Sequence, residues 1–172
     1  MKLPLERSLF LKASVLTAII LFTAGCRQQK DHSKEIDPIV DKYVEVWNTG
    51  NVDELDAVID TNFVRHAEST STEGLDNLKK LITGTRTAFP DLDLVLNDKI
   101  YSENRFAAHF SFTATNTGPG QMPPTGKSVE VWGVVIAHFA NGKATEEWVG
   151  YDNQSFLEQL GFTMIPPSGV GQ

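Results

Sequence analysis

One face of a predicted β-hairpin carries two carboxylates, a tryptophan and two glycines. Glu146, Trp148, Gly150 and Asp152 occupy alternate positions, and alternate residues of a strand point to the same face. The opposite strand adds Gly133 to this face. An aspartate in such an apolar setting is costly unless it is paired, hydrogen-bonded or protonated, and proteins accept this cost most often at functional sites. Because desolvation raises the proton affinity of a carboxylate, Asp152 and Glu146 are candidate acid–base groups.

The hairpin itself is predicted by Asn141-Gly142, the strongest short-range hairpin signal. β-Branched and aromatic residues dominate the preceding run, residues 128–139, and the returning strand begins after the turn. A two-residue loop fixes the register by counting outward. The predicted pairs are Ala140 with Lys143, Val135 with Trp148, and Val131 with Asp152. The opposite face then carries an apolar set: Trp132, Val134, Ile136 and Tyr151.

Several of these residues have a second interpretation. Asp152 precedes a short helical pattern over residues 155–160, and aspartate is a favoured N-cap. Glu146 could equally lie at the water-exposed rim of the sheet. His109 is better explained as a half-buried strand residue opposite Asp98. The tryptophans Trp47 and Trp148 fit core packing as well as a pocket wall, since both belong to one shell in a pocketed fold.

The elements that must position these residues follow from apolar spacing. A helix is predicted from Ile36 to Trp47, with Gly50 as a left-handed cap. Shorter elements are a helix over 53–59, a strand over 62–66, a polar loop over 68–72 and a helix over 73–88 that Pro90 stops. Long strands are predicted over residues 92–101, 105–115, 128–139 and 143–152. This order predicts an α+β fold with helices on one face of an antiparallel sheet.

The first 25 residues indicate a targeting segment. Lys2, Arg7 and Lys12 accompany an uncharged apolar run, residues 13–24, which is too short for a comfortable membrane span. The run ends at Thr23-Ala24-Gly25-Cys26, which is similar to a bacterial lipoprotein signal. An ordinary secretory signal with an incidental cysteine is the alternative. We expect a removed signal over 1–25, a polar tether over 26–33 and one domain over 34–172, anchored to the bacterial cell envelope by lipid on Cys26.

The charge balance narrows the class of partner. The whole chain has a formal charge of −7, and the predicted signal holds three basic residues and one acidic residue, so the remaining chain carries about −9. Nucleic-acid phosphates select basic surfaces, so this balance argues against nucleic acid as a partner. It also argues against direct binding to anionic lipid, which leaves the acyl chains as the membrane link.

Six groups of short segments, taken in order, resemble the SnoaL-like polyketide cyclases, or ester cyclases, of the nuclear transport factor 2-like superfamily. The matching segments are VWNTGN (46–51), NFVRH (62–66), EG (73–74) with AFPD (88–91), TATNTG (113–118), PPTGK (123–127), and EEW (146–148) with Asp152 and QLG (159–161). The resemblance covers nearly all of the predicted domain. It implies a curved sheet wrapped against three N-terminal helices into a cone with an interior pocket. It also implies a homodimer through the outer sheet face.

The family resemblance further implies an intramolecular aldol ring closure that needs no metal or cofactor. An aspartate acts as general acid and base in this chemistry, and a histidine assists. Carried over by position, the aspartate is Asp152 and the histidine is His66, with His109 and His138 as weaker alternatives. The expected substrate-binding residues are Trp47, Phe63, His109, Glu146 and Trp148.

A lipid-anchored protein is in a different place from cytoplasmic polyketide synthesis, so three functions stay open. The first is a cofactor-free cyclase, isomerase or hydrolase acting on a small apolar carbonyl compound. The second is a non-catalytic pocket that binds such a molecule at the cell envelope. The third is a dimeric interaction module whose pocket is filled by side chains. A homodimer is expected through the apolar face around Trp132, because an exposed contiguous apolar patch usually marks an interface.

Overall fold

The computed structural model describes residues 31–68 and 70–163. The predicted signal segment, Cys26 and most of the predicted tether lie outside the described residues. The first described helix, α2 (Ser33–Thr49), begins at the last residue of that tether. Among the described residues, no helix is long and apolar enough to cross a membrane.

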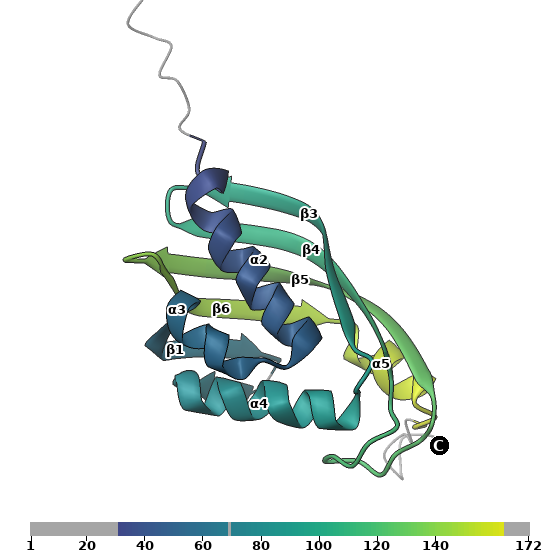
Figure 1. Cartoon of the computed structure of the whole chain (residues 1–172). Helices are drawn as coiled ribbons and strands as arrows, with labels where there is room; N and C mark the ends of the chain where they lie inside the picture. Colours follow the sequence, from purple (N-terminus) through teal and green to yellow (C-terminus); the bar gives the residue numbers. More distant parts are fainter. Residues whose placement is uncertain (1–30, 69, 164–172) are drawn as a thin grey trace, which may run out of the picture. The chain divides into compact units, whose positions relative to one another are not determined.

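A six-stranded curved sheet is the framework of the domain (Figure 1). Its strands are β1 (Ile59–Ala67), β2 (Thr70–Glu73), β3 (Asp93–Ser102), β4 (Arg105–Thr115), β5 (Ser128–Ala140) and β6 (Lys143–Tyr151). They lie in the order β2-β1-β6-β5-β4-β3. The α+β class is confirmed, with one difference from the predicted antiparallel sheet: β1 and β6 pair in parallel, while the other neighbours pair antiparallel.

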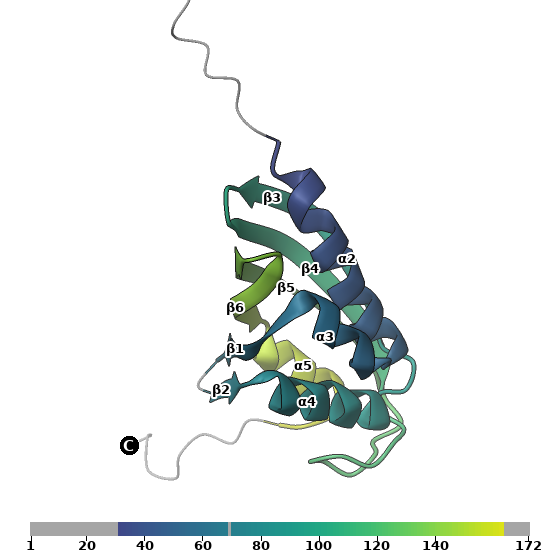
Figure 2. The ribbon, with the colours of Figure 1, turned by 60° about the vertical axis from the view of Figure 1, so that its left-hand side comes forward.

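The helices lie on one face of this sheet, as predicted. Figure 2 shows α2, α3 (Leu55–Val58) and α4 (Leu75–Ala88) on the same side, with the 3-10 turn η1 (Val52–Glu54) leading into α3. The short helix α5 (Asn153–Gln159) follows β6. Gly50 ends α2 with φ of 79°, and its N–H donates to the Val46 carbonyl, so the predicted left-handed cap is confirmed. The opposite face of the sheet is covered by none of the described helices.

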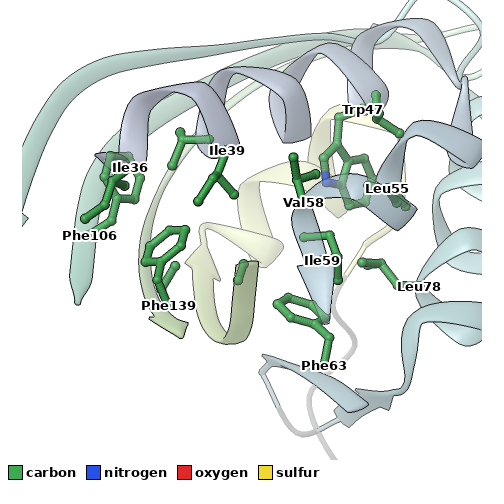
Figure 3. Close-up of a cluster of buried hydrophobic side chains, with 14 of the residues drawn as sticks. Ile36, Ile39, Trp47, Leu55, Val58, Ile59, Phe63, Leu78, Phe106 and Phe139 are labelled. Carbon is green, nitrogen blue, oxygen red and sulfur yellow. The ribbon is translucent and has the colours of Figure 1, made fainter. Parts of the chain in front are cut away.

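Apolar side chains from the helices and the sheet pack into two separate clusters. The larger one joins α2, α3, α4 and β1, and its members Leu55, Ile59, Phe63 and Leu78 are fully buried (Figure 3). The smaller one lies around Phe89, Leu92 and Leu160. Burial of such side chains stabilises the fold by about 1.5–3 kcal/mol each. Both clusters contribute walls to the cavity described below.

The β5–β6 hairpin departs from the predicted register by one residue. The turn is as expected: Asn141 and Gly142 have φ of 52° and 75°, and Ala140 pairs with Lys143. Thr145 is then an extra residue on β6, because Phe139 pairs with Ala144 whereas His138 pairs with Glu146. This is a β-bulge. The predicted pairs Val135 with Trp148 and Val131 with Asp152 are therefore wrong; Trp148 pairs with Ile136, and Val149 with Val135.

A one-residue slip moves every side chain of a strand to the other face. In β6, Glu147, Val149 and Tyr151 consequently point toward the helices, and Glu146 and Trp148 point away from them. The space predicted at Gly133 is absent as well, since a Cβ atom there would lie 2.4 Å from the Phe110 ring. The predicted loop over 68–72 is the third difference: it contains the start of β2, whose polar sequence gave no strand signal.

Candidate functional site

A cavity of about 650 Å³ lies between the helices and the inner face of the sheet. Its walls are largely apolar and come from α2, α4, α5, the sheet and the loop between β4 and β5. The aromatic residues that line it are Trp47, Phe89, Phe106, Phe110, Phe112, Phe139 and Phe156, with Tyr43 and Tyr151. The predicted interior pocket is therefore present, and the interior is not filled by side chains as the third functional hypothesis requires.

A buried ion pair supplies charge to this apolar cavity. Arg65 on β1 and Glu147 on β6 are directly opposite in the parallel pairing, and Nη1 of Arg65 donates to Oε1 of Glu147. Their side chains are only 14% and 3% exposed. The Tyr43 hydroxyl on α2 donates to the same oxygen over 2.8 Å. Charges this poorly solvated must be paired to be tolerated, and this pair satisfies the requirement.

Burial sets the protonation state of the two donors. It raises the pKa of Tyr43 well above 10, and the nearby Glu147 carboxylate raises it further, so Tyr43 is a neutral phenol that donates a hydrogen bond. Burial opposes the charge on Arg65, but the Glu147 carboxylate and Tyr43 together outweigh it and raise the pKa of the guanidinium. Arg65 also stacks over Trp47, with Cζ 5.3 Å from the ring centroid, a cation–π contact that holds the guanidinium against the cavity wall.

Both donors use one oxygen of Glu147 and leave the other available. Oε2 of Glu147 receives no hydrogen bond from the described residues. This oxygen is not fully buried. It is therefore accessible from the cavity. Arg65 also lines the cavity, and a guanidinium has five N–H donors. The site can thus present a carboxylate oxygen and positively charged donors to the same ligand.

Asp152 is not part of this cavity. Its side chain is exposed and accepts a hydrogen bond from the Ser155 N–H over 2.9 Å, so it is the N-cap of α5. The second interpretation of Asp152 is the one that the structure supports. The expected position of Asp152 on a pocket wall is wrong, because the bulge at Thr145 changes the face on which each residue of β6 lies.

His66 also lies away from the cavity, on the outer face of the sheet. Its ring stacks on Trp148 with centroids 5.0 Å apart, and its Nε2 lies 2.9 Å from Oε1 of Glu146. His138 lies on the other side of Trp148, with ring centroids 4.9 Å apart. Four expected site residues are thus on this outer face: His66, His109, Glu146 and Trp148. His109 pairs with Asp98, as the favoured interpretation predicts, but its side chain is exposed and not half-buried.

The two remaining expected contacts have different positions. Trp47 lines the cavity, as predicted. Phe63 is completely buried in the larger apolar cluster (Figure 3) and packs edge-to-face against Tyr43 at 6.4 Å, so it supports the site from behind. Among the described residues, no group of three or more His, Cys, Asp and Glu side chains is arranged to hold a metal ion.

Three polar residues of the cavity are not among the site residues predicted from the sequence: Tyr43, Arg65 and Glu147. Arg65 carried a usable signal, because it follows the core residue Phe63 by two positions and so shares its face of β1. A positive charge on that face requires a buried partner. Tyr43 was recognised as part of the apolar stripe of α2, and nothing in that pattern indicated that its hydroxyl would bind a carboxylate.

The model of the SnoaL-like polyketide cyclase family matches residues 38–160, which is most of the chain and includes every residue of this site. The protein belongs to the SnoaL-like polyketide cyclase family. A comparison with curated proteins finds no match. The family assignment and the curved sheet packed against helices agree with the resemblance seen in the sequence.

Three solved structures share this fold. AclR from Streptomyces galilaeus, a proposed hydroxylase, is 26% identical, with a TM-score of 0.67 over 80% of this chain and 87% of AclR. A proposed SnoaL-like polyketide cyclase from Jannaschia sp. CCS1 is 16% identical, with a TM-score of 0.71 over 80% of this chain and 99% of its own. IdmH from Streptomyces antibioticus, a proposed polyketide cyclase, is 21% identical, with a TM-score of 0.64 over 73% and 98%.

Proposed function

We propose that this SnoaL-like protein is an enzyme that moves a proton next to the carbonyl group of a small, largely apolar compound held in the cavity. The observation that carries the proposal is the Glu147 carboxylate, which is buried at a largely apolar cavity with Oε2 free to accept a proton. Family membership supports this type of chemistry. Ring closure and isomerisation of carbonyl compounds begin with such a proton transfer, whereas in hydrolysis the same kind of base would take its proton from water.

Each polar residue of the cavity has a role in this step. Glu147 Oε2 takes a proton from the carbon next to the carbonyl, and the electrons of the broken C–H bond move to the carbonyl oxygen. Arg65 donates hydrogen bonds to that oxygen as it becomes negative, which is where a fixed donor lowers the barrier most. In a ring closure the enolate carbon then bonds to a second carbonyl carbon, whose oxygen receives the proton. Tyr43 holds Glu147 in place and remains neutral throughout.

A second candidate is a binding protein that retains such a compound without changing it. The hydrogen bonds from Arg65 and Tyr43 to Glu147 favour this candidate, because hydrogen bonds to a carboxylate stabilise it and so make it a weaker base. The two candidates make the same prediction for binding and opposite predictions for turnover. A test must therefore measure both quantities on the same variants.

The test uses 2-acetylnaphthalene, an apolar ketone with exchangeable hydrogens next to its carbonyl. Binding is followed by tryptophan fluorescence, since Trp47 lines the cavity, and proton abstraction by the rate of deuterium uptake from D2O in NMR spectra. Glu147→Gln keeps the shape of the side chain but cannot act as the base, so it should slow the exchange by about 100-fold or more, with little loss of binding. Glu146→Gln is the matched control, because Glu146 is the preceding residue and lies on the outer face.

The results separate the candidates. Exchange that depends on Glu147 and not on Glu146 supports the enzyme. Binding without any accelerated exchange by the unmodified protein supports the binding protein. Equal exchange by the Glu147→Gln variant and the unmodified protein excludes Glu147 as the base, and the absence of binding refutes both candidates for this class of ligand.

A further inference from the structure

Tyr151 lines the cavity and carries a hydroxyl group that no described residue binds. Its ring is fixed between two phenylalanines, with centroids 6.1 Å from both Phe112 and Phe156 in edge-on contacts. The ring lines the cavity, yet no described residue forms a hydrogen bond with the phenol oxygen. A phenylalanine would serve this packing equally well. The hydroxyl therefore needs an explanation other than the apolar core.

Glu68 supplies a carboxylate on the same side of the cavity. It directly follows β1, and its φ is 52°, a conformation that asparagine or glycine adopts more readily. Nδ2 of Asn153 donates to its Oε2 over 3.2 Å, and Glu68 lines the cavity. Burial raises the pKa of Tyr151, and the charge of Glu68 adds to the effect. The phenol is thus a neutral donor beside a carboxylate acceptor.

This second polar position is displaced along β6 from Glu147, although the charge of Arg65 still acts on the phenol and lowers the pKa of Tyr151 against the effect of burial. Tyr151 follows Glu147 by four residues on the same face of β6, which corresponds to roughly 13 Å along a strand. Val149 lies between them and also lines the cavity. A ligand that reaches both positions must therefore carry two oxygen functions separated by an apolar body. One function contacts Arg65 and Glu147, and the other contacts Tyr151.

We propose that Tyr151, together with Glu68, is a specificity-determining site that hydrogen-bonds a hydroxyl group of the ligand at the end remote from its carbonyl. The phenol of Tyr151 donates to the ligand oxygen, and the Glu68 carboxylate accepts from the ligand hydroxyl. The inference rests on the proposed binding of a carbonyl compound in the cavity. It adds a selected substituent and the residues that select it.

Two matched ketones test the site: 2-acetylnaphthalene and 6-hydroxy-2-acetylnaphthalene, which differ by one hydroxyl group. The unmodified protein should bind the hydroxy ketone about 5-fold more tightly, the effect of one additional hydrogen bond. Tyr151→Phe should remove this preference, because it keeps the ring and deletes only the hydroxyl group. Tyr101→Phe is the control, because the Tyr101 hydroxyl bonds to Asp37 and Tyr101 does not line the cavity.

Three results would overturn the inference. If the unmodified protein binds both ketones equally, Tyr151 selects nothing, although the proposed function stands. If Tyr151→Phe weakens both ketones equally, the Tyr151 hydroxyl supports the cavity in general and does not select the ligand hydroxyl. If neither ketone binds, the proposed function fails and the inference fails with it. Retention of the preference in Tyr101→Phe and its loss in Tyr151→Phe, with a partial loss in Glu68→Gln, would support the site.

Discussion

Replacing the buried ion pair one residue at a time should destabilise the domain far more than replacing both residues together. Glu147→Leu leaves the Arg65 guanidinium without its carboxylate, and Arg65→Met leaves the carboxylate with the Tyr43 hydroxyl alone. The double variant removes both charges and fills the same space with apolar groups. The comparison therefore isolates the energetic coupling between the two residues.

The structure sets the size of the expected effect. Side-chain exposures of 14% for Arg65 and 3% for Glu147 place the pair among buried ion pairs, where removal of one partner costs about 3–5 kcal/mol. An exposed pair would contribute about 0–1 kcal/mol. The double variant should lose less than either single variant, because well-packed apolar replacements of buried pairs are often neutral or stabilising. The coupling energy should then be at least about 3 kcal/mol.

Urea denaturation followed by tryptophan fluorescence measures these changes, with an unchanged slope confirming that only stability is affected. Arg65→Met keeps much of the side-chain length, so it limits the contribution of lost packing. Lys42→Met is a suitable control: Lys42 pairs with Glu54, but both side chains are 35% exposed, and its loss should cost under about 1 kcal/mol. Additive losses in the double variant would refute the reasoning, since they would show that the two charges do not depend on each other.

Three further predictions follow from positions outside the cavity. Asp152→Asn should leave stability and ligand binding unchanged, whereas Asp152→Ala should cost about 1 kcal/mol in urea denaturation through loss of the α5 cap; loss of binding in Asp152→Asn would instead return Asp152 to the site. A homodimer is expected through the outer sheet face, where Trp132 and Ile136 are 60% and 48% exposed. Trp132→Asp should therefore convert a dimer to a monomer in light scattering. A monomeric unmodified domain at micromolar concentration would contradict this. Cys26→Ser should move the protein from the membrane to the soluble envelope fraction, and membrane retention of this variant in detergent partitioning would argue against lipid attachment.

The dimer prediction needs one change from its sequence-based form. Tyr151 was assigned to the outer apolar face, but it lines the cavity, and Trp148 takes its place on the outer face with 38% exposure. The remaining members, Trp132, Val134 and Ile136, are exposed as predicted. The outer face therefore keeps two aromatic residues, and it carries the histidines that contact Trp148.

Local patterns predicted most elements because local interactions determine them. The helical stripe from Ile36 to Trp47, its Gly50 cap and the bounds of β4 follow from spacing and turn chemistry within one segment. The parallel pairing of β1 with β6 does not, because these strands are separated by most of the domain. The strand β2 was missed because its exposed, polar sequence gains its hydrogen bonds from β1 rather than from any property of its own.

The location of the site depends on the register of β6 against β5, which the sequence of the hairpin alone does not determine. Glu146 and Glu147 are consecutive and chemically alike, and either register of the hairpin places a carboxylate and an aromatic residue on the inner face. The hairpin alone gives no reason to prefer one register. The neighbouring strand β1 gives a reason to prefer one register, because the glutamate that faces the cavity lies beside the residue of β1 that also faces it.

That residue of β1 is Arg65, and its buried positive charge is stable only when a carboxylate lies opposite it. An arginine on the same strand face as a fully buried phenylalanine must pair with a carboxylate. The bulge at Thr145 brings Glu147 directly opposite Arg65. If Thr145 instead paired flush with His138, without a bulge, Glu146 and Trp148 would face the cavity, at the expense of the contacts between Trp148 and the histidines on the outer face. The bulge at Thr145 thus decides which of two adjacent glutamates is buried beside Arg65 and which lies on the outer face.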